Sequence, residues 1–128
     1  MAAVARIARP IFVVLAMLFA VGVVVQYFSA GLGLLGGETM QFHIDFGWAA
    51  MHLFPILMFV VALLSRLSRG LLIMSLVLAV LTFLQPIWVA EFRGEFLGAM
   101  HVLGALIIAF LARDIAERAY RYWRTTPA

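Results

Sequence analysis

Two histidines fall inside apolar stretches of this 128-residue chain and are its strongest candidates for chemistry. His52 lies in the second apolar stretch and His101 in the fourth. An imidazole ring buried in hydrocarbon needs a polar partner, which can be another side chain, a metal or a cofactor. The two rings are therefore the starting point for predicting a function, and the elements that carry them come next.

The composition indicates a membrane protein. Hydrophobic residues make up 66% of the chain, charged residues only 12%, and the mean hydropathy is +1.13. A soluble domain of this size needs more polar surface. The basic residues are all arginines and stand at the ends of apolar segments, which favours membrane anchors over a nucleic-acid surface. The absence of cysteine excludes disulfides, iron–sulfur clusters and thiolate ligands.

The hydropathy pattern predicts an all-α fold with one transmembrane domain over residues 1–128. The four predicted spans are residues 10–30, 42–64, 71–90 and 95–112, followed by an amphipathic tail over 113–128. Each span has about the 20 residues that a bilayer core requires. We interpret the first span as a retained helix with Pro10 in its first turn, and not as a signal peptide. Gln85 and Pro86 predict a kink or an early break near the end of the third span.

The charges predict an orientation. Arginines dominate the N-terminus, the connection between spans two and three, and the tail, whereas the other two connections are mainly acidic. By the positive-inside rule, both termini face the cytoplasm. Short connections then give an up-down-up-down four-helix bundle in the cytoplasmic membrane. The tail is predicted to be an interfacial helix on anionic lipid, or to dock on a partner subunit.

The orientation places His52 and His101 at one depth. His52 lies seven positions after Asp45 and His101 six after Glu95, which puts both rings roughly 10 Å below the acidic rim. In a square bundle, spans two and four are diagonal neighbours across the core. Two histidines that face each other there can supply both axial ligands of a b-type haem. We therefore predict haem b, with His52 and His101 as the ligands of its iron.

Four further residues are candidates for shaping that site. Gly98 and Gly104 lie on the His101 face of span four and could leave room for a flat macrocycle. The alternative is that they allow close helix packing. Gln26 and Gln85 lie near the histidine level and could hydrogen-bond a ring nitrogen. The alternative is that these glutamines pair between helices.

His43 receives a different interpretation. It lies nine positions before His52, which on a straight helix is half a turn out of phase and about 13 Å higher. We expect an interfacial or solvated histidine. The functional alternatives are a second ligand site, a contact to a haem propionate, or a divalent metal site shared with nearby acidic residues such as Glu38. No spacing here matches a known metal motif.

Three motifs carry a resemblance to a known family. They are QYFSAGLG over residues 26–33, HIDFGWAAMH over 43–52, and Met100-His101 before an apolar run. Together they resemble a family of small four-helix bacterial integral membrane proteins of unknown function. The resemblance covers about residues 26–112 and implies four spans, with Gln26, His43, His52 and His101 as functional positions. It supplies no activity. In outline the chain also resembles the membrane b-type cytochromes, although three histidines suffice for only one bis-histidine haem.

Three classes of function follow from these observations. The first is a haem-binding electron carrier between a quinol and an acceptor on the outer side. The second is a non-catalytic subunit of a larger membrane complex or a homo-oligomer, with histidines that bond between helices or ligate a partner's pigment. The third is a proton-conducting or transport element, which the lack of acidic residues deep in a span disfavours. The chain shows no catalytic cluster, so a carrier or accessory subunit is favoured over an enzyme.

Overall fold

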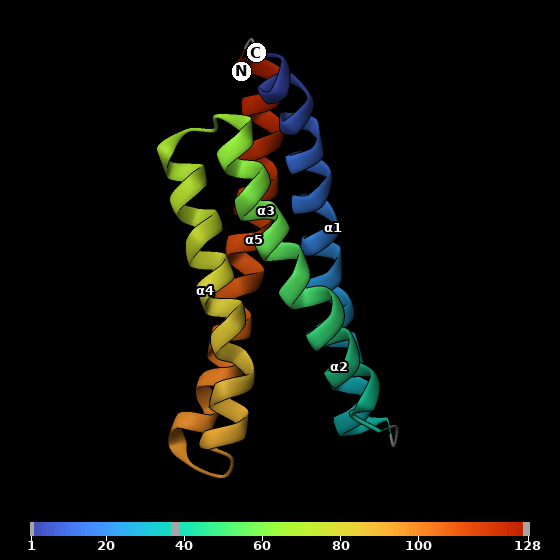
Figure 1. Cartoon of the computed structure of the whole chain (residues 1–128). Coiled ribbons are helices and arrows are strands. Elements are labelled where there is room, and N and C mark those ends of the chain that lie inside the picture. The colour runs from blue at the N-terminus through green and yellow to red at the C-terminus, as the bar shows by residue number, and fades with distance from the viewer. Residues whose placement is uncertain (1, 37–38, 127–128) are drawn as a thin grey trace.

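The structure is a computed structural model that describes residues 2–36 and 39–126, and every regular element in this part of the chain is helical (Figure 1). The long helices are α1 (Ala2–Leu35), α3 (His52–Ser65), α4 (Arg69–Glu91) and α5 (Met100–Thr125). The short helix α2 (Gln41–Phe46) continues into α3 through a π-helical turn, η1 (Gly47–Met51). A 3₁₀ turn, η2 (Phe96–Ala99), precedes α5.

Four helical stretches are long and apolar enough to cross a membrane. They are Ala3–Leu35, Gln41–Ser65, Arg69–Glu91 and Phe96–Thr125. Large apolar side chains cover their outer surfaces, and many are exposed by 40% or more, which suits contact with lipid. These helices confirm the predicted all-helical class and fit a small four-helix membrane protein.

The four stretches form a square. Helix α1 packs against α3 and α5, and α4 packs against the same two helices. Helices α3 and α5 are therefore diagonal neighbours, as the sequence analysis expected. Figure 1 shows the two chain termini at one end of the bundle, which we call the terminal end. The opposite end, which carries α2 and η2, is called the loop end.

Buried positions recur every three or four residues along each helix. On α4 they are Leu71, Ser75, Leu78 and Thr82, and on α5 they are Gly104, Ile108, Ala112, Ile115 and Ala119. This spacing is typical of helices that pack at shallow angles. The hydroxyls of Ser75 and Thr82 donate to carbonyls four residues earlier, each over 2.8 Å. Because these hydroxyls are satisfied within their own helix, the neighbouring helix can pack closely without supplying a polar partner.

Three prolines lie inside helices. Pro10 was expected in a first turn, but α1 begins at Ala2, so this expectation was wrong. For Pro86 a kink or an early break was expected, and α4 shows no break, since it continues to Glu91. Pro55 lies inside α3, directly after the π-helical turn. Long membrane helices tolerate proline because neighbouring helices support the backbone around it.

A buried arginine joins three helices at the terminal end. Arg9 of α1 is 7% exposed. Its Nε donates to the Ser65 carbonyl at the end of α3 over 3.2 Å, and its Nη1 donates to the Thr126 carbonyl after α5 over 2.9 Å. The guanidinium also lies 5.2 Å from the centre of the Tyr122 ring. One side chain therefore ties α1, α3 and α5 together.

Replacing Arg9 by Met should destabilise the bundle. The substitution keeps much of the apolar stem and removes the charged donors, so the buried carbonyl of Ser65 loses its donor. We expect a loss of roughly 2 kcal/mol in the free energy of unfolding, measured by circular dichroism during denaturation in mixed micelles. Arg6→Met, at an exposed position three residues earlier, is the matched control. Equal stability of the two variants would contradict the assigned role.

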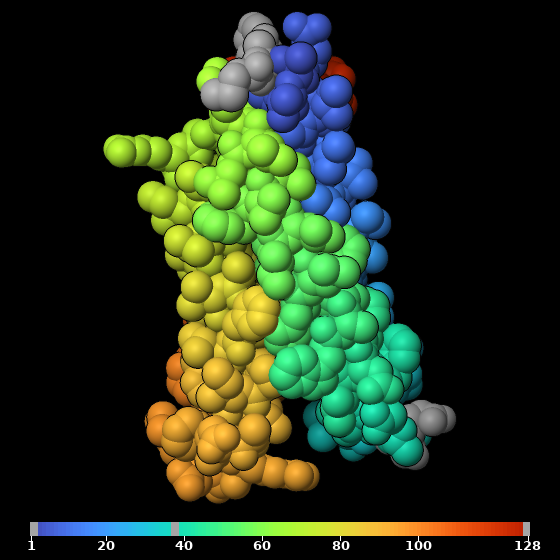
Figure 2. Space-filling view, viewed as in Figure 1, coloured from blue at the N-terminus to red at the C-terminus, as the bar shows by residue number. Residues whose placement is uncertain are grey.

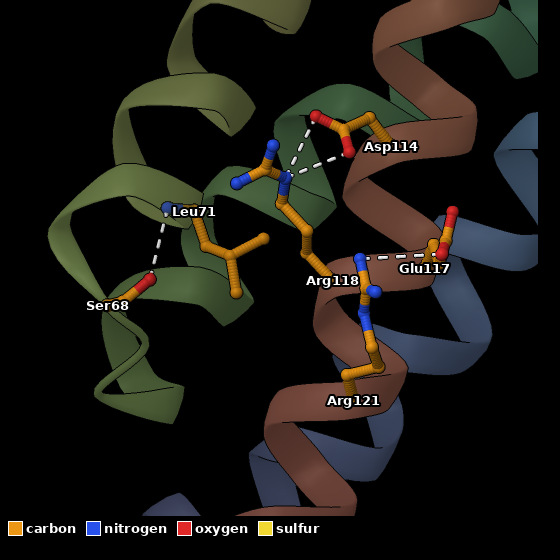
Figure 3. A network of polar contacts seen from close by, with 6 residues as sticks. All are labelled: Ser68, Leu71, Asp114, Glu117, Arg118 and Arg121. Atoms are coloured by element: carbon orange, nitrogen blue, oxygen red, sulfur yellow. Dashed lines mark hydrogen bonds and ion pairs between the residues drawn. The ribbon is translucent and has the colours of Figure 1, made fainter.

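The amphipathic tail continues α5 without interruption. Its buried residues Ile115 and Ala119 pack into the bundle core, so one face of the tail belongs to the bundle. The opposite side carries an ion pair of 2.8 Å between Arg118 and Asp114 and one of 3.4 Å between Arg121 and Glu117 (Figure 3). Figure 3 also shows the start of α4, where the Ser68 hydroxyl accepts from the Leu71 amide over 3.4 Å. These polar contacts are each local to one helix, so the buried face of the tail is what connects it to the bundle.

Candidate functional site

The candidate site lies where the packed core gives way to the loop end. All six residues of α2 and all four of η2 are exposed or only partly buried. In Figure 2 a notch separates the end formed by α1 and α2 from the end formed by α4 and η2. The three histidines belong to this half of the molecule. Local backbone geometry decides which of them meet.

The π-helical turn changes the direction of the His43 side chain. In an α-helix, a proline ring clashes with the carbonyl four residues earlier, which for Pro55 is Met51, the last residue of η1. A π-helical turn accommodates one extra residue. The nine positions between His43 and His52 then act like eight, so the angle between them falls from about 180° to about 80°. Both histidines can therefore point towards the bundle.

Gly47, the first residue of that turn, lies against α1. A Cβ atom at this position would come within 2.7 Å of the Gln26 side-chain nitrogen. A larger residue here would push the end of the Gln26 side chain aside. Gly47 and Pro55 together are the sequence signal for the turn, although neither identifies it alone.

The structure brings His43 and His101 together. Their ring centroids are 6.2 Å apart and their planes meet at 75°. The His43 Nδ1 atom lies 3.1 Å from the Gln26 carbonyl oxygen and 3.3 Å from the Ser29 hydroxyl of α1. His43 is thus partly buried and bonded to α1, where the sequence led us to expect a solvated or interfacial ring. Ser29 was not among the predicted site residues.

His101 is oriented by α4. Its Nδ1 atom lies 3.0 Å from the Gln85 carbonyl oxygen. Gln26 and Gln85 were predicted to hydrogen-bond a ring nitrogen through their side chains, but the contacts to His43 and His101 come from their backbone carbonyls. The side-chain nitrogen and oxygen of Gln85 are buried and have no hydrogen-bond partner among the described residues. The amide therefore remains available to a small polar partner.

His52 has a separate aromatic environment. Its ring stacks on Trp48, with centroids 4.8 Å apart and planes 13° from parallel, and meets Phe83 edge-on at 5.0 Å. Its Nδ1 atom lies 2.8 Å from the Gly47 carbonyl oxygen. Its Nε2 atom is buried without a hydrogen-bond partner among the described residues. Phe83 and Gln85 are two residues apart on α4, so His52 and His101 lie at nearly the same level, as expected.

The two glycines of the predicted site lie in close packing contacts. A Cβ atom at Gly104 would collide with the Gln85 side-chain nitrogen and would come within 2.6 Å of the Trp88 ring. A Cβ atom at Gly98 would collide with the Phe92 carbonyl oxygen. The space beside both glycines is thus taken up by α4 and the chain that follows it. This favours the packing interpretation over open room for a macrocycle.

The hydrogen bonds assign the same tautomer to all three histidines. A carbonyl oxygen only accepts, so each Nδ1 atom that faces one must carry the proton and donate. Each Nε2 atom then has a free lone pair, which is the form in which imidazole binds a metal. Histidine ligands in proteins commonly donate their other ring N–H to a backbone carbonyl in this way. The arrangement can therefore supply nitrogen ligands.

The acidic residues do not add metal ligands to the three histidine nitrogens. Among residues 2–36 and 39–126, no three His, Cys, Asp or Glu side chains lie close enough to hold a metal ion. Glu38, a candidate for a divalent site with His43, lies outside the described residues. A haem iron needs only two imidazoles, because the porphyrin supplies the remaining nitrogens.

Comparison of the chain with protein-family models, with curated proteins and with solved structures finds no match. The resemblance described above therefore depends on its short motifs alone.

Proposed function

We propose that the protein is a small haem-binding membrane protein, similar in outline to the b-type cytochromes. One haem b is held between spans two and four by His101 and a histidine of span two. The sequence favours His52 as that histidine. The haem supplies one-electron transfer when bound, with a potential that depends on its axial ligands and their surroundings.

One observation carries this proposal: every histidine has its Nδ1 atom against a backbone carbonyl and its Nε2 lone pair free. Membrane helices rarely contain three such rings at one end of a bundle without a use for them. In this proposal the carbonyls of Gln26 and Gln85 orient two of the rings and increase the basicity of their Nε2 atoms.

The charge distribution supports the orientation that goes with this function. The terminal end carries Arg6, Arg9, Arg66 and Arg69 together with the arginines of the tail, whereas Asp45, Glu91, Arg93 and Glu95 lie at the loop end. We infer an up-down-up-down bundle in the bacterial cytoplasmic membrane with both termini in the cytoplasm. The histidines then lie near the outer leaflet, where a quinol or an outer-side redox protein can exchange electrons.

An absorption spectrum tests the proposal directly. Protein expressed with ample haem and purified in detergent should show a Soret band and, after dithionite reduction, sharp α and β bands. These are the bands of low-spin, six-coordinate haem, and a pyridine haemochrome assay should give about one haem per chain. A folded protein with a featureless visible spectrum would contradict the proposal. The accessory-subunit hypothesis would then take its place, to be tested by purifying the complex.

A further inference from the structure

Span two carries two histidines, His43 and His52. The one whose ring contacts His101 is the better candidate for the second ligand. We propose that His43, and not His52, is the second axial ligand, opposite His101. This assignment rests on the proposed haem function and replaces the ligand pair that the sequence favoured. Three observations support it.

The first is the separation of the rings. The His43 and His101 centroids are 6.2 Å apart. A metal bound at ~2.0 Å by the Nε2 atoms of two imidazoles on opposite sides separates their centroids by about 6.3 Å. The separation of the two centroids is therefore compatible with one shared iron. Each is oriented from a different neighbour, His43 by α1 and His101 by α4.

The second observation concerns access. The Nε2 atom of His52 is enclosed by protein, and its ring is held between Trp48 and Phe83. A ligand as large as haem could reach this atom only if the side chains that enclose it moved. The Nε2 atoms of His43 and His101 are not enclosed in this way. His43 lies in α2 and His101 in the first turn of α5, both at the loop end.

The third observation is the backbone between the two histidines of span two. The π-helical turn over Gly47–Met51 is what directs His43 towards α5, and π-helical turns occur frequently at functional sites. His52 bonds through Nδ1 to the Gly47 carbonyl, the first carbonyl of this turn. The His52 ring is thus bonded to the backbone of its own span and is not the ring that contacts His101.

Spin state separates the two assignments. The full-length chain in detergent should be compared as wild type, His43→Ala and His52→Ala by electron paramagnetic resonance and haemochrome assay. Wild type should be low-spin. In His43→Ala the haem should become high-spin, or the haem content should fall about tenfold. In His52→Ala the haem should remain low-spin, and most of it should be retained. The reverse pattern, with low-spin haem lost only in His52→Ala, would overturn the assignment.

A rescue experiment guards against variants that merely misfold. His43→Gly leaves space for free imidazole, so adding imidazole should restore the low-spin spectrum. Failure of rescue in a monodisperse, helical His43→Gly protein would count against His43 as a ligand. A wild-type protein that binds no haem would overturn the proposed function itself, and this outcome is recognised before any variant is made.

Discussion

Replacing His101 by Ala is expected to abolish low-spin haem and to reduce the haem retained after purification to below about one tenth of the wild-type amount. His101 is the one histidine of span four, and both candidate pairs require it. In the proposed site an alanine would leave the haem iron with a single protein ligand, and it would also remove the bond from the ring to the Gln85 carbonyl. The measurements are the haemochrome stoichiometry and the oxidised spectrum of the purified variant.

Val102→Ala is the matched control for this experiment. Val102 follows His101 in the same helix and is 69% exposed, so its truncation should leave both haem content and spin state unchanged. Circular dichroism should show equal helix content in the two variants. Wild-type haem binding in His101→Ala would remove span four from the site and contradict both ligand assignments.

The second large effect is expected from Gly98→Ala. The new methyl group would collide with the Phe92 carbonyl oxygen, which belongs to the backbone and cannot rotate away as a side chain can. The turn between α4 and α5 must then shift, and His101 lies three residues further along. We expect a loss of roughly 1 to 3 kcal/mol in the free energy of unfolding, together with weaker haem retention.

Gly70→Ala provides the comparison for Gly98→Ala. Among the described residues no heavy atom lies within 4 Å of a Cβ atom at Gly70, and alanine is the better helix former there. Gly70→Ala should therefore be as stable as the wild type or more so. Denaturation in mixed micelles measures both variants. A Gly98→Ala protein with the stability of Gly70→Ala would show that the turn is not tightly constrained.

The helices of this fold could be predicted because they depend on local properties of the sequence. Length and hydropathy identify the four apolar stretches, and short connections lead to the diagonal arrangement of spans two and four. The prolines were harder to interpret. Pro10 lies within α1 and not in its first turn, because neighbouring helices support the backbone around it, and a single sequence does not reveal those neighbours.

The site was predicted only in part. The histidines do contact the segments that carry Gln26 and Gln85, but through backbone carbonyls and not through the glutamine side chains. The sequence analysis nevertheless predicted that His43 points away from the other two rings, because a helical wheel assumes 3.6 residues per turn throughout. One π-helical turn invalidates that assumption. It depends on contacts across the bundle, such as Gly47 against Gln26, as much as on Pro55.

The surroundings of the two glycines also depend on contacts between helices, and they could therefore not be predicted from the sequence. A wheel shows which residues share a face, but it does not show what fills the space opposite them. Gly104 faces the Gln85 and Trp88 side chains. Which side chains fill the space beside a glycine depends on how two helices pack, so it is known only once the positions of both helices are known.

The π-helical turn also affects how related sequences should be aligned. A chain with an unbroken α-helix in this place would present the same two side-chain directions with its histidines eight positions apart, because eight steps of an α-helix leave an angle of about 80°. A nine-residue spacing with the turn and an eight-residue spacing without it are thus geometrically equivalent. An alignment that allows a one-residue gap between positions 46 and 52 would match the two forms, whereas an ungapped comparison would place one histidine out of register.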